Sequence, residues 1–443
     1  MKFALHGIST RGINILLMKK ILLPVLLVSL VSAWSGRAAD ARTFDVREFG
    51  AKGDGKTIDT AAIQQALDAS GKAGGGIVRL KPGTYLSQPI YLRDKTTLQL
   101  DAGAKLLATD EPAHFDDPRK PQSRVAFVNG KDLTQVAITG GGIIDGAGER
   151  WWKPVVEGKR LARAKGETFN ETVRRPRLII LSGCRDVRVE GVTIQNSPTF
   201  HLVPSECENV LITNVTFRAP DEAPNTDAID PSACKNVRII GCTIDVGDDN
   251  IAIKSGRKVV GREAAVENVW VERCTFLHGH GMSIGSETAG GVKSLVVTNC
   301  TFNGTTSGIR IKSARGKGGL VENLVYADIT MTNVDYPIYL TSYYPKVPAN
   351  DAAQPVATNS PVYRNIVIRN LTAHSAKTAG MLVGLPELPI ENVTLENVRV
   401  TAPTGLMFRN ARAIKLQNTT VTPAKGLPFI LEANAEVEGL PQR

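Results

Sequence analysis

The sequence predicts an all-β fold, a right-handed parallel β-helix, from three observations: a recurring strand motif, one short helix pattern before it, and cysteines at fixed places in the repeat. Each copy of the motif alternates β-branched and polar residues and then turns at Asn, Gly or Asp, as a half-buried strand does. A unit of this size cannot bury its own apolar face, so the units must stack. The copies begin at Asp186, Asn209, Asn236, Asn268, Ser294, Asn323, Asn365 and Asn392.

The helix pattern lies in "TIDTAAIQQALDASGKAGGG", which begins at Thr57. Asp59 or Thr60 suits the N-cap, Ile63, Ala66 and Leu67 share one face, and glycines end the pattern. We expect this helix to cap the open end of the solenoid, because an uncovered end exposes strand edges and invites aggregation.

The segment from Met18 to residue 38 has a basic start, an apolar run and small residues, which is typical of a secretory signal. Residues 1–17 lie upstream of a start at Met18 that is complete by itself. The apolar run is too short to span a bilayer, and no other stretch approaches the roughly 20 apolar residues needed. We therefore expect residues 39–443 to form a single β-helix domain, secreted or periplasmic and free of the membrane once the signal is removed.

Charge indicates the kind of partner. Residues 39–443 hold 48 basic and 43 acidic side chains, because the leader holds five basic residues and no acidic one. A modestly basic exported protein is more consistent with an anionic polysaccharide than with nucleic acid. We expect a monomer acting on such a polymer.

The cysteines form two ladders of three: Cys242, Cys274 and Cys300 stand where other copies have aliphatic residues, and Cys184, Cys207 and Cys234 share the frame S-x-C-x-[D/N]-V. An even count in an exported chain suggests disulfides. Replacement of aliphatic residues in a stack instead indicates buried free thiols, which we favour. No spacing resembles a zinc site, and we expect no metal and no cofactor.

Alignment of the copies by their strands brings "TDAID", "DDNIA", "GHGMS" and "TSGIR" into register. Coils of a β-helix lie about 4.8 Å apart, so the aligned polar residues should form a column on one small patch. Asp248 is next to this column in sequence. Close carboxylates repel one another and shift each other's pKa values, as at functional sites. The column consists of Asp227, Asp249, His280 and Ser307.

Glycoside cleavage needs such a group, because one carboxyl must donate a proton while another stays ionised. Arg310 and Lys312, in "RIKS", project near the same column and suit a carboxylate on the sugar. The pattern therefore favours a uronic acid as the target.

Four motifs in this order, "NTDAID", "GDDNIAIKSG", "GHGMSIGS" and "RIK", resemble those of the polygalacturonases, glycoside hydrolase family 28. "FGAKGDGKTIDTAAIQQALD" and "LDAGAKLLA" resemble the N-terminal part of that family, so the likeness covers residues 44–421. It implies a pectin-lyase-like β-helix. It also implies an inverting hydrolase of α-1,4-galacturonosyl linkages in polygalacturonate and pectin, without metal.

The resemblance also implies roles for single residues. Asp248 would be the acid, Asp227 and Asp249 would activate water, and His280 would support them. Crowding by the other carboxyls predicts a raised pKa for Asp248. The residues that match the substrate-binding group of the family are Asn225, Arg310, Lys312 and Tyr343, and the departures from the family's motifs are Ala228 and Asn250.

Other interpretations stay open at this point. A pectate lyase shares the fold and substrate but uses calcium and a basic side chain. A binding solenoid such as a phage spike would have no reason to keep aspartates in one column. A hydrolase of the same family acting on rhamnogalacturonan or substituted pectin also fits, and endo or exo action depends on loops around the cleft.

Several residues also have plainer interpretations. Asp227 alone suits a turn, and His280 alone suits a surface or structural histidine. His201 either reaches a sugar subsite or packs in a turn. Trp151, Trp152 and the basic residues 153–177 form either a solvated loop or a wall of the cleft.

Overall fold

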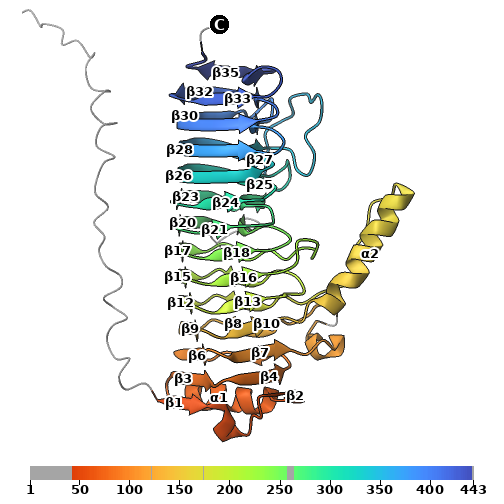
Figure 1. Cartoon of the computed structure of the whole chain (residues 1–443), viewed down its shortest axis with the longest axis vertical. Coiled ribbons are helices and arrows are strands. Elements are labelled where there is room, and N and C mark those ends of the chain that lie inside the picture. Colours follow the sequence, from red (N-terminus) through yellow and green to blue (C-terminus); the bar gives the residue numbers. More distant parts are fainter. Residues whose placement is uncertain (1–41, 121, 173, 257–263, 442–443) are drawn as a thin grey trace, which may run out of the picture. The chain divides into compact units, whose positions relative to one another are not determined.

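The computed structural model describes residues 42–441 apart from residues 121, 173 and 257–263, and it is a right-handed parallel β-helix (Figure 1). The predicted fold class is confirmed. The segment from Arg42 onward forms one compact unit. The predicted leader and its boundary at residue 38 lie outside the described residues. In the part that is described, no helix is long and apolar enough to cross a membrane.

Three sheets form the coils of the described chain, and all pairings between their strands are parallel. The sheet of 24 strands comprises β1 (Thr43–Asp45), β2 (Asp54–Ile58), β3 (Gly76–Leu80), β4 (Gly83–Ser87), β6 (Thr96–Leu100), β7 (Ala104–Ala108), β9 (Thr134–Gly140), β10 (Ile143–Asp145), β12 (Arg185–Glu190), β13 (Thr193–Gln195), β15 (Glu208–Thr213), β16 (Thr216–Arg218), β17 (Lys235–Ile240), β18 (Thr243–Asp245), β20 (Val266–Glu272), β21 (Thr275–Phe276), β23 (Val292–Thr298), β24 (Thr301–Asn303), β26 (Leu320–Val334), β28 (Val362–Ser375), β30 (Ile390–Ala402), β32 (Ala411–Gln417), β33 (Thr420–Pro423) and β35 (Ala435–Glu438).

The other two sheets together make the face that matters for function. One comprises β5 (Ile90–Tyr91), β8 (Val128–Lys131), β11 (Ile179–Ser182) and β14 (Leu202–Ser205). The other comprises β19 (Ile251–Ser255), β22 (Met282–Thr288), β25 (Ser307–Lys312), β27 (Tyr336–Thr341), β29 (Gly380–Val383), β31 (Leu406–Arg409) and β34 (Phe429–Leu431). Ile229 pairs with Leu202 on one side and Ile251 on the other, so the two sheets continue into each other. We call this continuous surface the short-strand face.

The Asn that opens most copies of the motif has a physical reason. Asn209 and Asn236 both have φ 57°, in the left-handed region that Asn tolerates better than most residues. Their amides form a ladder, since Asn236 Nδ2 donates to Asn209 Oδ1 at 3.0 Å and Asn268 Nδ2 donates to Asn236 Oδ1 at 3.1 Å. Each copy of the repeated motif therefore encodes both the turn of a coil and the strand that follows it.

Helix α1 (Thr60–Lys72) confirms the predicted cap and buries Ile63, Ala66 and Leu67 at the N-terminal end of the stack (Figure 1). Asp59 holds the N-cap position, but its side chain does not bond to the helix. Its carboxylate instead accepts the N–H groups of Lys52 and Gly53 at 2.7 and 2.9 Å. The side chain therefore fastens the preceding loop. Two 3-10 turns, η2 (Val46–Phe49) and η3 (Pro112–Phe115), complete this region.

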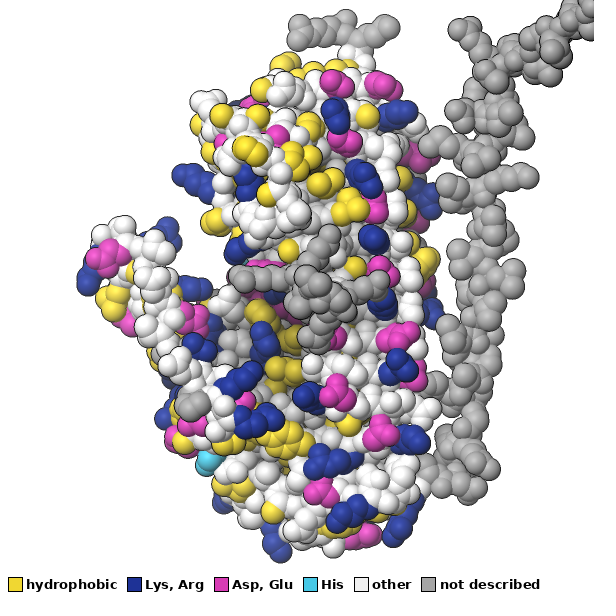
Figure 2. All heavy atoms as spheres, turned by 180° about the vertical axis from the view of Figure 1, so that it is seen from behind, with side chains coloured by type: hydrophobic (Ala, Val, Ile, Leu, Met, Phe, Trp, Pro, Cys, Tyr) yellow, Lys and Arg dark blue, Asp and Glu magenta, His cyan; other side chains and the backbone are white. Residues whose placement is uncertain are grey.

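Helix α2 (Glu149–Lys165) replaces the loop expected after Trp151 and Trp152. Both tryptophans are buried at its base, where Trp152 Nε1 donates to the carbonyl of Ser197 at 3.0 Å. The rest of the helix projects from the coil stack (Figures 1 and 2). Figure 2 shows Lys and Arg interspersed with Asp and Glu over the face that it draws, so recognition of an anion depends on local groups and not on a broad positive field.

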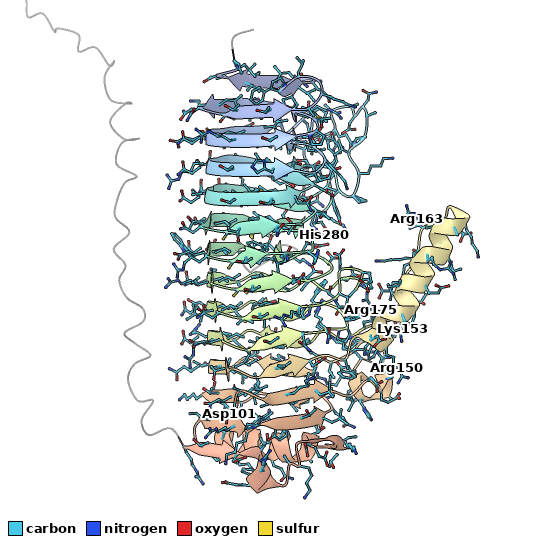
Figure 3. All side chains as sticks on the ribbon, in the orientation of Figure 1. Asp101, Arg150, Lys153, Arg163, Arg175 and His280 are labelled. Atoms are coloured by element: carbon cyan, nitrogen blue, oxygen red, sulfur yellow. The ribbon has the colours of Figure 1, made fainter. Side chains whose placement is uncertain are left out.

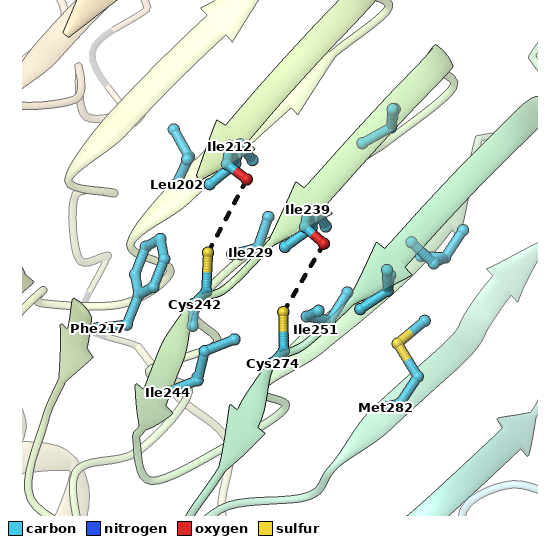
Figure 4. Close-up of a cluster of buried hydrophobic side chains, with 14 of the residues drawn as sticks. Leu202, Ile212, Phe217, Ile229, Ile239, Cys242, Ile244, Ile251, Cys274 and Met282 are labelled. Atoms are coloured by element: carbon cyan, nitrogen blue, oxygen red, sulfur yellow. Dashed lines mark hydrogen bonds between the residues drawn. The ribbon is translucent and has the colours of Figure 1, made fainter. Parts of the chain in front are cut away.

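The cysteine ladders lie in the core, and all six thiols are free and buried. Cys242 Sγ lies 4.0 Å from the carbonyl oxygen of Ile212, and Cys274 Sγ lies 3.7 Å from that of Ile239 (Figure 4). Each thiol therefore contacts the strand of the preceding coil and fills the place of an aliphatic side chain.

We expect denatured, unreduced protein to titrate as six thiols, because none of the cysteines is paired in the fold. Ellman titration in guanidinium measures this, and protein reduced beforehand is the control. A titration that finds two thiols or fewer would contradict this arrangement.

Candidate active site

The register of the short-strand face produces the predicted column. Ile229 pairs with Ile251, Ile251 with Met282, and Met282 with Ile309. The column residues each lie two positions before a member of this series, so they follow one another coil by coil. Arg310 pairs directly with Ser283, which in turn pairs with Ala252. The alignment of the four motifs in the sequence thus agrees with the register in which the strands pair.

Asp249 is a buried carboxylate held by two cations. Its Oδ1 lies 3.0 Å from Arg310 Nη1, its Oδ2 lies 2.7 Å from Lys312 Nζ, and Ser283 Oγ donates to Oδ1 at 2.7 Å. Burial by itself would raise the pKa of Asp249, but the charges of Lys312 and Arg310 outweigh burial and hold the pKa below its usual range. Asp249 is therefore ionised at neutral pH.

Asp248 is the most exposed of the three carboxyls, with 23% of its side chain accessible against 4% for Asp227 and 3% for Asp249. Its Oδ1 lies 3.1 Å from His280 Nδ1 and also accepts the backbone N–H of Asp249 at 2.9 Å. Burial would raise the pKa of Asp248, but the hydrogen bond from His280 outweighs it and the pKa is lowered. The expectation of a raised pKa at Asp248 is wrong for the free protein.

The carboxyl with the raised pKa is Asp227. Its Oδ2 lies 3.1 Å from Lys254 Nζ, and the same ammonium lies 2.7 Å from Asp230 Oδ2. Burial first and the charge of Asp230 second raise the pKa of Asp227 well above its usual value, and burial raises the pKa of Asp230 to about 6. Lys254 and Asp230 were not among the residues predicted from the sequence to form the site. The sequence did contain a signal for them. Asp230 lies in "NTDAID" and Lys254 lies in "GDDNIAIKSG", the motifs of two adjacent coils.

Tyr344 is an aromatic residue whose ring lies beside both cations. Its ring centroid lies 5.1 Å from Lys312 Nζ and 5.9 Å from the guanidinium carbon of Arg310. Tyr343, which the resemblance indicated, is buried against Val383, and its hydroxyl donates to Asp351 Oδ2 at 2.6 Å. Both tyrosines lie in a bend after β27, and of the two it is Tyr344 whose ring faces Lys312 and Arg310, whereas the Tyr343 ring centroid lies 5.8 Å from the guanidinium carbon of Arg315.

Asn225 connects the segment after α2 to the site. Arg175 Nη2 donates to Asn225 Oδ1 at 2.9 Å, and Asn225 Nδ2 lies 3.5 Å from Asp248 Oδ2. Arg175 also donates to the carbonyls of Pro198 and Pro224 and is itself buried. Figure 3 shows Arg175 and His280 on the side of the stack from which α2 projects.

His201 packs in a turn below the site. It is fully buried, its Nδ1 lies 3.1 Å from the carbonyl oxygen of Asp227, and its backbone N–H donates to the same carbonyl at 2.8 Å. Burial lowers the pKa of His201 to about 4, so the ring is neutral at ordinary pH. Of the two interpretations of His201, the packed turn agrees with the structure.

One group of side chains has the spacing of a metal site. Donor atoms of Asp248, Asp249 and His280 all lie within 4.8 Å of one another. Both oxygens of Asp249 are already bound by Arg310, Lys312 and Ser283, so a metal ion would have to displace those partners. We therefore assign no metal to this group.

Comparison with known proteins places this site in a family. Residues 86–422 match the family described as glycosyl hydrolases family 28, and residues 43–111 match one described as rhamnogalacturonase A/epimerase, pectate lyase-like. The chain is 32% identical to an endo-polygalacturonase of Pectobacterium parmentieri over 413 residues, which is 88% of this chain and 96% of that protein. It is also 32% identical to a probable polygalacturonase of Vitis vinifera over 388 residues, 83% of this chain and 76% of that one.

A solved structure is similar as well. The hyperthermoactive exopolygalacturonase from Thermotoga maritima aligns with a TM-score of 0.71 and 26% identity, covering 86% of this chain and 92% of that chain. The family match covers all four motifs of the column, and the relatives share most of their length with this chain. The chain belongs to the glycosyl hydrolases family 28 and is a glycoside hydrolase.

Proposed function

We propose that this hydrolase cleaves α-1,4-galacturonosyl linkages of polygalacturonate and de-esterified pectin by single displacement with inversion. The observation that supports it most is the pair Arg310 and Lys312, two cations largely withdrawn from solvent beside Asp249 and one coil beyond His280. Such a pair suits the carboxylate of a uronic acid. Relatives named as polygalacturonases support the same substrate.

Exposure and contacts support the following roles in the reaction. Asp248, the most accessible carboxyl, donates a proton to the leaving oxygen, and His280 orients it. Asp227 and Asp249 activate the water that attacks from the opposite side. Inversion requires room for that water, with acid and base carboxyls about 6.5 to 9.5 Å apart. The nearest carboxylate oxygens of Asp248 and Asp249 lie within 4.8 Å of each other, so we assign this spacing to the pair Asp248 and Asp227.

Substrate contacts involve the residues around the cations. Arg310 and Lys312 bind the sugar carboxylate, and Asn225 contacts the sugar next to Asp248. Tyr344 takes the role first given to Tyr343, because its ring faces the cations and offers a surface for a sugar ring. We further propose that the protein is secreted or periplasmic, on the basis of the leader pattern at residues 18–38, and that it acts as a monomer.

Binding of an anionic sugar should raise the pKa of Asp248, which a proton donor requires. In the free protein the hydrogen bond from His280 and the charge of Lys312 lower the pKa of Asp248. A uronate bound at Lys312 adds negative charge near Asp248 and offsets that cation. Both effects raise the pKa of a carboxyl, so Asp248 becomes protonated more readily in the complex.

We therefore expect the limb of the bell-shaped pH profile that Asp248 sets to lie at higher pH in kcat than in kcat/KM, by about one unit. The profile of kcat reports the complex, whereas that of kcat/KM reports the free protein. Initial rates on polygalacturonate from about pH 3 to pH 8 measure both. Methyl-esterified pectin is the control, because a neutral ester should produce little displacement. Coincident profiles on polygalacturonate would contradict this account.

Product analysis tests the function itself. The protein is incubated with polygalacturonate, methylated pectin and rhamnogalacturonan, and products are resolved by chromatography. We expect saturated galacturonate products from the first substrate, formed equally in excess chelator. Loss of activity with EDTA, restored by calcium and accompanied by unsaturated products, would indicate a lyase.

Rhamnogalacturonan is the second candidate substrate, because residues 43–111 match the rhamnogalacturonase A/epimerase description. Those residues lie in the N-terminal coils, away from the carboxyls and from Arg310. The pair of cations therefore favours polygalacturonate. Preferential cleavage of rhamnogalacturonan in the same assay would reverse the order of the two candidates.

A further inference from the structure

We propose that Lys254 and Asp230 are positioning residues for this reaction: Lys254 favours the ionised form of Asp227, and Asp230 opposes it by sharing the same ammonium group. This inference rests on the proposed function, in which Asp227 activates water. Neither residue needs to touch the substrate. Both act by changing how readily Asp227 takes up a proton.

The geometry brings the three groups together from adjacent coils. Asp227 and Asp230 flank Ile229, which continues the short-strand face, and Lys254 follows one coil later in β19, where it pairs with Ser232. Lys254 Nζ lies 3.1 Å from Asp227 Oδ2 and 2.7 Å from Asp230 Oδ2. The ammonium is thus shared between two carboxyls, with the shorter contact to Asp230.

The charges in this cluster do not balance. The side chains of Asp227 and Asp230 are only 4% and 1% exposed. The Oδ1 atoms of both are buried without a hydrogen-bond partner among the described residues. Two buried carboxyls with one ammonium cannot both ionise at low cost, so they titrate as a coupled pair. A purely structural ion pair would need only one of them.

The other charged groups around Asp227 do not supply the missing charge. Asp248 and Asp249 add negative charge and raise the pKa of Asp227 further. Arg177 acts on Asp230 and offsets part of the rise in the pKa of that residue. His201, against the backbone of Asp227, is neutral. Lys254 is therefore the cation that acts most directly on Asp227.

Lys254 has a defined position and some space around it. Its ammonium lies 4.2 Å from the ring centroid of Phe200. Lys254, Phe200, Asp230 and Arg177 line a cavity of 310 Å³ on the short-strand face. This cavity leaves room for a larger cation at position 254, which allows a variant that keeps the charge.

The test uses substitutions with opposite expected effects on the pH profile of kcat/KM for polygalacturonate. Lys254→Met removes the cation, so the limb of the profile set by Asp227 should move to higher pH by about one unit or more. Asp230→Asn keeps the shape, removes the competing carboxylate and should move the same limb to lower pH. Lys254→Arg, which keeps the charge, should leave the limb near its wild-type position. Shifts in the same direction for Lys254→Met and Asp230→Asn, or no shift in either, would overturn the proposal.

Failure of the proposed function gives a different result from failure of this inference. Wild-type protein without activity on polygalacturonate rejects the function, and thermal unfolding then tests the pair. A carboxyl whose pKa is raised by folding loses its stabilising contribution as pH rises through the folded value. Relative to wild type, Lys254→Met should therefore be more destabilised at about pH 8 than at about pH 4. Asp230→Asn should show the opposite dependence and be less destabilised at about pH 8 than at about pH 4. Equal effects at both pH values would reject the inference on its own.

Discussion

Asp248→Asn is expected to lower kcat on polygalacturonate by roughly a thousandfold with little change in KM, which lies within the range for loss of a general acid. The amide keeps the shape of the side chain but cannot supply the proton that the leaving oxygen needs. Binding should survive, because Arg310 and Lys312 contact Asp249 and not Asp248. Steady-state kinetics on polygalacturonate measure both parameters.

Two comparisons identify the lost step as proton donation. An aryl galacturonide with a good leaving group needs little protonation, so Asp248→Asn should retain much more activity on it than on the polymer. Asp227→Asn and Asp249→Asn should impair both substrates alike, because water activation is needed for each. Retention of kcat on the polymer by Asp248→Asn would remove Asp248 from the role of acid.

The stereochemistry of the first product tests the same roles independently. A water placed between acid and base attacks the face opposite the leaving group, so an α-linked substrate should release a β-anomer first. Proton NMR during the first turnovers resolves the anomers before they equilibrate. Early appearance of the α-anomer would show a retaining mechanism, and the assignment of Asp227 and Asp249 as water activators would fail.

The fold and the column were predictable because both depend on regular spacing. Side chains alternate with period two along each strand, and one coil follows another in parallel register. A motif repeated once per coil therefore fixes which residues lie above one another. Asp227 and Asp249 illustrate this, since Ile229 and Ile251 pair as the alignment requires. The N-terminal helix was predictable for a similar reason, because its apolar face has the helical period.

Features that depend on contacts between side chains were not predictable in the same way. The lowered pKa of Asp248 depends on His280 from the next coil approaching to 3.1 Å. The choice between Tyr343 and Tyr344 depends on the path of the chain just after β27, where strand periodicity no longer applies. Helix α2 was missed because its sequence is rich in Lys and Arg and contains Pro154 and Gly158, and such a composition also suits a loop.

Lys312→Ala is expected to lower kcat/KM on polygalacturonate. The loss should correspond to roughly 2 to 4 kcal/mol of transition-state stabilisation, the range for charge-assisted contacts that are withdrawn from water. Arg310→Ala should have an effect in the same range. Both losses should be small on methyl-esterified pectin, because the ester has no charge to bind. An exposed arginine on the 24-stranded sheet, Arg364, provides the control Arg364→Ala. Unchanged kcat/KM for Lys312→Ala would remove the argument for a uronate.

Lys312→Ala should also destabilise the fold, and this second effect must be separated from the first. Lys312 is 6% exposed and binds Asp249 Oδ2, so its removal leaves a buried carboxylate short of a cation, at a cost of about 3 to 5 kcal/mol. The pKa of Asp249 is lowered by folding, so its stabilising contribution is present at neutral pH and is lost as pH falls through the folded value. The destabilisation should therefore shrink in acid.

The double variant Lys312→Ala/Asp249→Asn separates binding from stability. Removal of the carboxylate together with its cation should recover much of the melting temperature at neutral pH, because no unpaired charge stays buried. Activity should not recover, since both the uronate contact and one water activator are absent. Because loss of Asp249 by itself impairs catalysis, binding of an oligogalacturonate, measured by calorimetry, is the second readout. Recovery of stability without recovery of binding would place Lys312 in two roles, one with Asp249 in the free protein and one with the substrate. Recovery of both would mean that Lys312 only neutralises Asp249, and the substrate carboxylate would need another partner.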